Sequence, residues 1–132
     1  MRRIALMVFR LFFKAFYYFY HICKCASRDD ISYEEGFRWI KRTTILANRA
    51  GRVKIDAHGM ENLPEKDGFI MFPNHQGLFD VLVFLESCPR PFAFVIKKEA
   101  ANIILLKQVR EALGSLVMDR EDIRQSMKVI QT

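Results

Sequence analysis

The N-terminal stretch from Ile4 to Ala26 contains no glycine or proline and predicts one long helix. Its polar positions recur at spacings of three and four residues, which places them on one stripe of the helix: Arg10, Lys14, Tyr17, His21 and Lys24. The rest of the helix surface is apolar and rich in aromatic side chains, Phe12 and Phe16 among them. Such a helix must cover its apolar side with protein or with lipid.

Three placements of this helix are open. A membrane-spanning helix would hold Arg10 and Lys14 near the middle of the bilayer, where each charge costs about 2.5–3.5 kcal/mol. A helix lying in the interface would set the same charges against lipid phosphates at no such cost. The alternative is a core helix packed against the rest of the protein. We expect the interfacial helix, with Arg10, Lys14, Phe12 and Phe16 binding the membrane surface; a cleaved signal peptide fits less well, because two charges interrupt the apolar run.

The net charge of the chain indicates which class of partner to expect, and its cysteines indicate which cellular compartment to expect. The net charge is +6 over 132 residues, which suits anionic partners such as lipid headgroups or phosphorylated substrates. Nucleic acid is not expected, because the N-terminal basic residues lie among bulky apolar side chains. The cysteines Cys23, Cys25 and Cys88 have no zinc-type spacing and leave one unpaired in any disulfide scheme. We therefore expect a reducing location, the cytoplasmic face of a membrane.

A second helix is predicted from Tyr33 to about Ala50. Ser32 and Glu35 form a capping box at its start, and Gly51 is a natural stop at its end. The short polar segment between the two helices predicts an antiparallel pair. Residues 1–52 are thus expected to form an N-terminal helical, membrane-binding region.

The pattern changes at Val53, where short apolar runs begin to alternate with helical segments. Strands are expected at 53–57, 69–72, 92–96 and 115–118, and helices at 78–87, from Glu99 onward and from Glu121 onward. This alternation is typical of an α/β fold with a mainly parallel sheet flanked by helices. We expect residues 53–132 to form this α/β domain.

The sequence Asn74-His75-Gln76-Gly77-Leu78-Phe79-Asp80 carries the strongest chemical signal in the chain. An imidazole, with an ordinary pKa of about 6.5, suits a general base, and a carboxylate on its other nitrogen fixes its tautomer and orientation. Asp80 would lie in the first turn of a helix, where the dipole keeps it ionised, and Gly77 would allow a sharp turn between the two. The alternative is a chance match, since a lone His-x4-Asp spacing arises easily.

Three further blocks, together with the first, resemble the 1-acylglycerol-3-phosphate acyltransferase family, whose signature is Asn-His-x4-Asp. Gly59-Met60-Glu61-Asn62-Leu63-Pro64 is similar to the family's Gly-x-Glu-Asn-Leu-Pro turn. The stretch 93–99 resembles its Lys-Lys-Glu block, and 114–120 resembles its second motif, a strand that ends in Asp-Arg. The blocks follow the family's order from about Val53 onward.

The resemblance implies transfer of a fatty acyl group from acyl-CoA or acyl carrier protein to the free hydroxyl of lysophosphatidic acid, giving phosphatidic acid. His75 would be the general base and Asp80 the residue that orients it. The remaining site residues implied are Arg120 on the substrate phosphate, with Asn74, Lys97 and Gly114 beside it. Because ligands bind at the carboxyl ends of parallel strands, Arg120 and His75 are expected to border one pocket. No metal or other cofactor is implied, and the N-terminal helical pair would seat the enzyme on the bilayer.

This chain departs from the family pattern in two places. Many members carry serine where Gly77 stands, and a third motif, Phe-Pro-Glu-Gly-Thr-Arg, belongs some tens of residues after Arg120 and does not occur here. We therefore expect these residues to be the N-terminal part of an acyltransferase, with the C-terminal part of the fold missing. Two alternatives stay open: another acceptor, such as glycerol-3-phosphate or another lysolipid, and a truncated, inactive membrane-binding protein.

Overall fold

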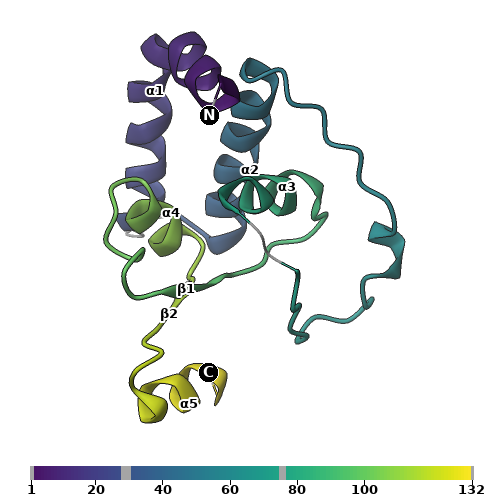
Figure 1. Cartoon of the computed structure of the whole chain (residues 1–132), viewed down its shortest axis with the longest axis vertical. Coiled ribbons are helices and arrows are strands. Elements are labelled where there is room, and N and C mark those ends of the chain that lie inside the picture. Colours follow the sequence, from purple (N-terminus) through teal and green to yellow (C-terminus); the bar gives the residue numbers. More distant parts are fainter. Residues whose placement is uncertain (1, 28–30, 75–76, 132) are drawn as a thin grey trace.

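The computed structural model describes residues 2–27, 31–74 and 77–131 of the chain. Its elements in chain order are α1 (Arg2–Ser27), α2 (Tyr33–Ala50), the short 3-10 helix η1 (Met60–Asn62), α3 (Leu78–Ser87), β1 (Val95–Lys97), α4 (Leu106–Ala112), β2 (Leu116–Met118) and α5 (Ile123–Gln131). Helices α1 to α4 lie together above a small sheet in Figure 1, and α5 lies at the far end of the molecule from α1. The described chain is therefore an α/β structure.

Helices α1 and α2 form the antiparallel pair that the sequence predicts (Figure 1). The Ser32 side chain accepts a hydrogen bond from the Glu35 amide at 3.2 Å and caps α2 at its start. Helix α2 ends at Ala50 with Gly51 as its C-cap, as the sequence predicts. Local capping signals thus set both ends of this helix.

The first turns of α1 are fastened to the C-terminal end of α2. The Arg3 guanidinium donates to the Gly51 carbonyl at 3.2 Å, and that of Arg10 to the Ala50 carbonyl at 3.3 Å. Cations at this end of a helix stabilise its unpaired carbonyls and its dipole. A Cβ atom on Gly51 would lie 2.6 Å from the Met7 methyl carbon, so the helices approach closely here. Arg10, expected to bind lipid phosphate, therefore also has a partner within the protein.

The hydrophobic core lies between α1, α2, α3 and α4. Its buried members come from all four helices or the turns that end them: Ile22, Cys25, Phe37, Ile40, Leu85, Ala112 and Leu113. Helices α2 and α4 approach closely within this core, because a Cβ atom on Gly36 would lie 3.0 Å from the Ala112 carbonyl oxygen. The N-terminal helical pair and the chain after residue 53 thus share one core.

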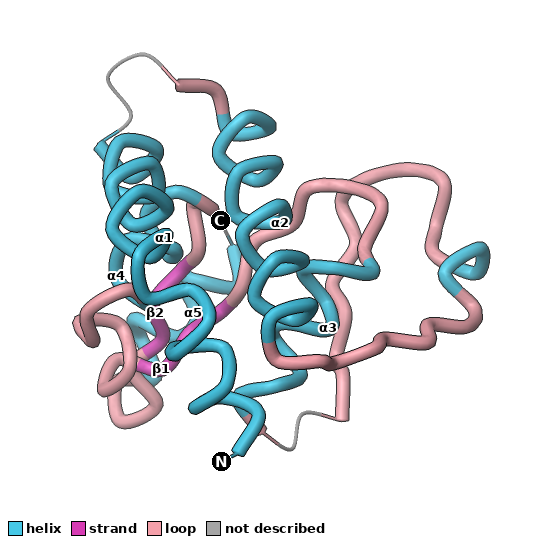
Figure 2. The backbone as a smooth tube through the Cα atoms, turned by 90° about the horizontal axis from the view of Figure 1, so that it is seen from above, coloured by secondary structure: helices cyan, strands magenta, loops and turns pink. Residues whose placement is uncertain are grey.

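The sheet contains two parallel strands, β1 and β2, among the described residues. Their register pairs Val95 with Leu116 and Lys97 with Met118, and the connection between them passes through α4. Figure 2 shows the two strands side by side in magenta. Because the strands are parallel, the chain leaves both of them at the same edge of the sheet.

The strands expected at 53–57 and 69–72 are wrong, and those expected at 92–96 and 115–118 are found at 95–97 and 116–118. Residues 53–57 and 69–72 belong instead to the long loop on the right of Figure 1. Ile70 is 65% exposed and Phe72 91% exposed, so the second segment is not the buried strand that its apolar run indicates. A strand needs a neighbouring strand to pair with, and among the described residues neither segment is paired with one.

The helix expected from Glu99 is also wrong in its start, because α4 begins at Leu106. Residues 98–105 form successive turns instead, and Leu105 has the left-handed φ of 74°, which interrupts a helix. Ile103 and Ile104, which lie within these turns, are 54% and 78% exposed.

The structure also bears on the membrane-spanning placement considered for α1. Within the described ranges, no helix combines the length and the apolarity that crossing a membrane requires.

Replacing Gly36 by valine is expected to destabilise the fold by about 1–3 kcal/mol, because the new side chain is forced against the backbone of α4. Urea unfolding followed by circular dichroism measures this change. Arg38→Val is the matched control, since it places the same side chain at an exposed position of the same helix and should cost only a few tenths of a kcal/mol (roughly the range of helix propensities). Equal stability of Gly36→Val and wild type would show that the contact between α2 and α4 yields without cost.

Candidate functional site

Asp80 lies in the first turn of α3, as the sequence predicts. Its carboxylate oxygen Oδ2 accepts a hydrogen bond from the Gly77 amide at 3.0 Å, and its own amide donates to the Gly77 carbonyl at 3.1 Å. The helix dipole and this hydrogen bond both favour the ionised carboxylate. The Asp80 side chain is half-buried and is therefore held in a defined place at the N-terminal end of α3.

The role expected for Gly77 is not what the backbone shows. Its φ of −174° is extended, a conformation open to any residue, and a Cβ atom there would have no neighbour within 4 Å among the described atoms. The local backbone would therefore accept the serine that the resemblance leads one to expect.

His75, the predicted general base, lies outside the described residues. Its pairing with Asp80, and the pocket it would share with Arg120, therefore stay predictions. Asn74, on the described side of this segment, is exposed.

Arg120 lies in the turn that follows β2, and its side chain is exposed. It makes no hydrogen bond or ion pair in the part of the chain that the structure describes. An ordinary salt bridge from Arg120 to a neighbouring aspartate is therefore not what the structure contains. Instead, Asp119 pairs with Lys98 at 2.7 Å. The guanidinium of Arg120 is left accessible to an anionic ligand.

Lys97 and Gly114 have different surroundings. Lys97 is the last residue of β1 and is exposed at the edge where β2 also ends. Gly114, in the turn between α4 and β2, has a φ of 59°. That conformation favours glycine, so Gly114 has a structural reason to be there whatever its role toward a substrate.

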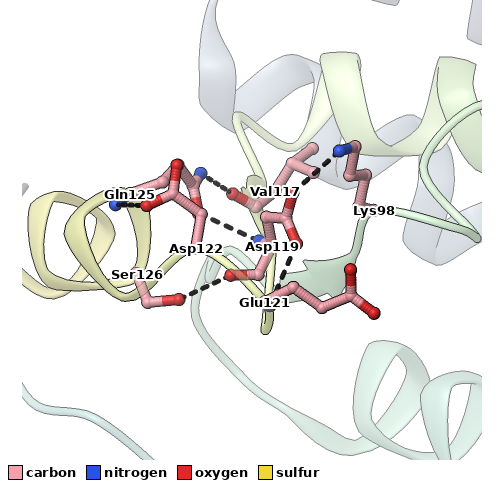
Figure 3. A network of polar contacts seen from close by, with 7 residues as sticks. All are labelled: Lys98, Val117, Asp119, Glu121, Asp122, Gln125 and Ser126. Atoms are coloured by element: carbon pink, nitrogen blue, oxygen red, sulfur yellow. Dashed lines mark hydrogen bonds and ion pairs between the residues drawn. The ribbon is translucent and has the colours of Figure 1, made fainter.

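The turn after β2 is held by a network of side chains that sequence reasoning missed (Figure 3). The hydrogen bond between Lys98 and Asp119 raises the pKa of the lysine and lowers the pKa of the aspartate. Both groups are thus charged around neutral pH. The signal available in the sequence was positional, because Lys98 and Asp119 each follow a predicted strand of the same parallel sheet.

The polar stripe of α1 runs along α2. The His21 ring stacks on the Trp39 ring with 4.2 Å between centroids and 10° between planes, and Tyr17 contacts the His21 ring at 4.5 Å. Lys14 is exposed and has no hydrogen bond or ion pair to a described residue. One part of the stripe therefore joins the helices, and Lys14 is left to solvent.

Helix α1 also carries an exposed apolar face, opposite its buried side. Its members are Val8, Phe9, Phe12, Phe13, Phe16 and Tyr20, each more than half exposed. Part of this face, with Ala5 and Arg10, lines a shallow hollow on the helix surface. Exposed apolar area of this extent is typical of a contact surface for protein or membrane.

The described residues also include cysteines and other side chains of the kinds that bind metal ions. The three cysteines are free, and burial raises the pKa of the Cys25 thiol, which keeps it protonated and unreactive. No group of three or more histidine, cysteine, aspartate or glutamate side chains is placed to hold a metal ion within the described ranges.

Comparison with known proteins assigns the family. Residues 54–132 match the Acyltransferase family. The chain is also 31% identical over 72 residues to a protein of Borreliella burgdorferi named 1-acyl-sn-glycerol-3-phosphate acyltransferase, an alignment that covers 54% of this chain and 29% of that protein. The chain thus spans under a third of the length of this relative. No solved structure matches the chain. Because the family match covers more than half of its residues, the chain belongs to the acyltransferase family.

Proposed function

We propose that the protein transfers a fatty acyl group from a thioester, acyl-CoA or acyl carrier protein, to the sn-2 hydroxyl of 1-acylglycerol-3-phosphate. The observation that carries this proposal is the Asn74–Asp80 signature within the family match over residues 54–132. The name of the relative from Borreliella burgdorferi supports the choice of acceptor.

In this reaction His75 accepts the proton of the acceptor hydroxyl while the hydroxyl oxygen attacks the thioester carbonyl carbon. The carbon–sulfur bond then breaks, and His75 returns the proton to the leaving thiolate. Asp80 orients the imidazole and stabilises its charged form. The hydrogen bond from the Gly77 amide and the position of Asp80 in the first turn of α3 support this role, because they hold the carboxylate in a fixed place.

Arg120 binds the acceptor phosphate in this proposal. A guanidinium can bind a phosphate through two parallel hydrogen bonds, and the exposed Arg120 has no competing partner among the described residues. Lys97, at the same sheet edge, adds a second positive charge. Glycerol-3-phosphate and other phosphorylated lysolipids carry the same group, so acceptor competition is the way to rank them.

Replacing His75 by alanine is expected to lower the turnover number of the full-length protein by at least about 10²–10⁴, the usual contribution of general acid–base catalysis. The measurement is thioester-dependent acylation of lysophosphatidic acid. His58→Ala is the matched control, because His58 is 85% exposed and pairs only with the equally exposed Asp56 in the described chain. Near wild-type turnover of His75→Ala would remove this residue from the mechanism.

Two substitutions at Asp80 separate its capping role from its catalytic role. Asp80→Asn keeps an oxygen that can accept from the Gly77 amide, so the unfolding free energy should stay within about 0.5 kcal/mol while turnover falls by about 10² or more. Asp80→Ala should lose the same turnover and also about 1 kcal/mol of stability, because the cap is gone. Wild-type turnover of Asp80→Asn would assign Asp80 to capping alone.

We propose further that α1 lies on the cytoplasmic face of a membrane with its exposed apolar face among the lipid headgroups. The large exposed aromatic side chains support this placement, as does Lys14, which is exposed and has no hydrogen bond or ion pair to a described residue. The fastening of Arg3 and Arg10 to the end of α2 holds the helix against the rest of the protein while that face stays uncovered.

The double substitution Phe13→Ser and Phe16→Ser is expected to weaken binding to anionic lipid vesicles by at least about tenfold, because each ring loses its apolar contact. Co-sedimentation with vesicles measures it. Lys14→Gln should weaken binding at low salt and have little effect at high salt. Met127→Ser, at a 56% exposed apolar side chain of α5, is the control. Unchanged vesicle binding with a lower unfolding free energy would mean that another part of the protein covers the face instead.

A further inference from the structure

The turn that presents Arg120 is fixed through Asp119, whose polar groups all have partners (Figure 3). The Asp119 amide donates to Gln125 Oε1 at 2.9 Å, and its carbonyl accepts from the Ser126 hydroxyl at 2.8 Å. Its carboxylate accepts from Lys98 Nζ at 2.7 Å through Oδ2 and from the Glu121 amide at 3.1 Å through Oδ1. Asp119, the residue before Arg120, is thereby bonded to the residue that follows β1, to α5 and to its own turn.

The same contacts hold the two ends of the turn. The Asp122 amide donates to the Asp119 carbonyl at 3.3 Å, which closes a β-turn with Arg120 at its second position. Gln125 also donates from Nε2 to the Val117 carbonyl at 2.7 Å, so one side chain of α5 grips the strand on both sides of Met118. The backbone at Arg120 has little freedom as a result.

Lys98 differs from the other members of this network because it carries the positive charge that neutralises the Asp119 carboxylate. Asp119 is next to Arg120 in the chain, and an unpaired carboxylate there would attract the guanidinium and repel an incoming phosphate. Lys98 occupies that carboxylate from the neighbouring strand end. Lys97, the last residue of β1, makes no such contact: among the described residues it is Lys98, the first residue after the strand, whose ammonium reaches the Asp119 carboxylate.

We propose that Lys98 is a positioning residue, which holds and neutralises Asp119 so that Arg120 stays available to the phosphate of the acceptor. The proposal rests on the proposed function of Arg120. It assigns the two neighbouring lysines different tasks: Lys97 faces the ligand and Lys98 acts through Asp119. It also makes the sheet, rather than the loop alone, responsible for the geometry of the phosphate site.

The expected result for Lys98→Met is an apparent KM for lysophosphatidic acid raised by about fivefold, the upper end of what one exposed ion pair is worth, with kcat changed less than about twofold. Adding Asp119→Asn to Lys98→Met should bring KM back toward wild type, because the competing carboxylate is gone. Lys98→Arg, which keeps the ion pair, should behave as wild type. Lys107→Met, at an exposed lysine of α4, removes the same charge elsewhere and is the control.

A double-mutant cycle with Arg120→Gln decides whether Lys98 acts through Arg120. In the Arg120→Gln protein, Lys98→Met should raise KM no further. If Lys98 bound the phosphate itself, the two effects would multiply, and Asp119→Asn would give no rescue. Either of these results would overturn the proposal, as would a wild-type KM in Lys98→Met.

Equilibrium binding of lysophosphatidic acid, compared with a monoacylglycerol that lacks the phosphate, separates this proposal from the proposed function. A wild-type protein that binds the phosphate in a Lys98-dependent way but transfers no acyl group would contradict the function and support the role of Lys98. If the wild-type protein transfers acyl groups and the Lys98→Met protein binds the phosphate as tightly as wild type, the proposed function is supported and the role of Lys98 is contradicted. Absence of both transfer and phosphate preference in the wild type would overturn both.

Discussion

The burial of one side of α1 against α2 and α4 is the constraint on which the rest of the described structure depends. Ile22 and Cys25 enter the same core as Phe37, Ile40 and Leu113, so the helical pair and the later part of the described chain are buried against each other. Gly36 permits this arrangement because its missing side chain lets α2 approach the Ala112 carbonyl. Helix α1, for which we propose a membrane contact, therefore also packs against the part of the chain that matches the acyltransferase family, and its two sides make different contacts.

The sequence was most informative where short-range physics decides the outcome. The Ser32 cap of α2 and the unbroken helix α1 were predictable because side chains and backbone within one turn suffice to specify them. The strands expected at 53–57 and 69–72 failed because strand formation depends on partners far away in the chain. An apolar run such as 69–72 indicates that burial is favourable, but it does not say which neighbour provides it.

In the candidate site, too, features set by nearby residues were predictable and features that depend on distant partners were not. Placing Asp80 in the first turn of α3 needed only the Asn74–Asp80 stretch and helix geometry. The contact between Lys98 and Asp119 needed the register of two parallel strands, which no local pattern supplies. The fastening of Arg10 to α2 was unpredictable for the same reason, because a guanidinium on a basic stripe has the same sequence signature whether it meets a phosphate or a helix end.

The two-sided character of α1 also affects how the protein is made. Chains are synthesised from the N-terminus, at about 5–20 residues per second. Since Ala112 and Leu113 follow α1 by more than eighty residues, α1 spends several seconds outside the ribosome with its core side uncovered as well as its exposed apolar face. During that interval the nascent helix exposes apolar side chains on both sides of its polar stripe, and early contact with a bilayer or a chaperone would keep it from aggregating before its own core exists.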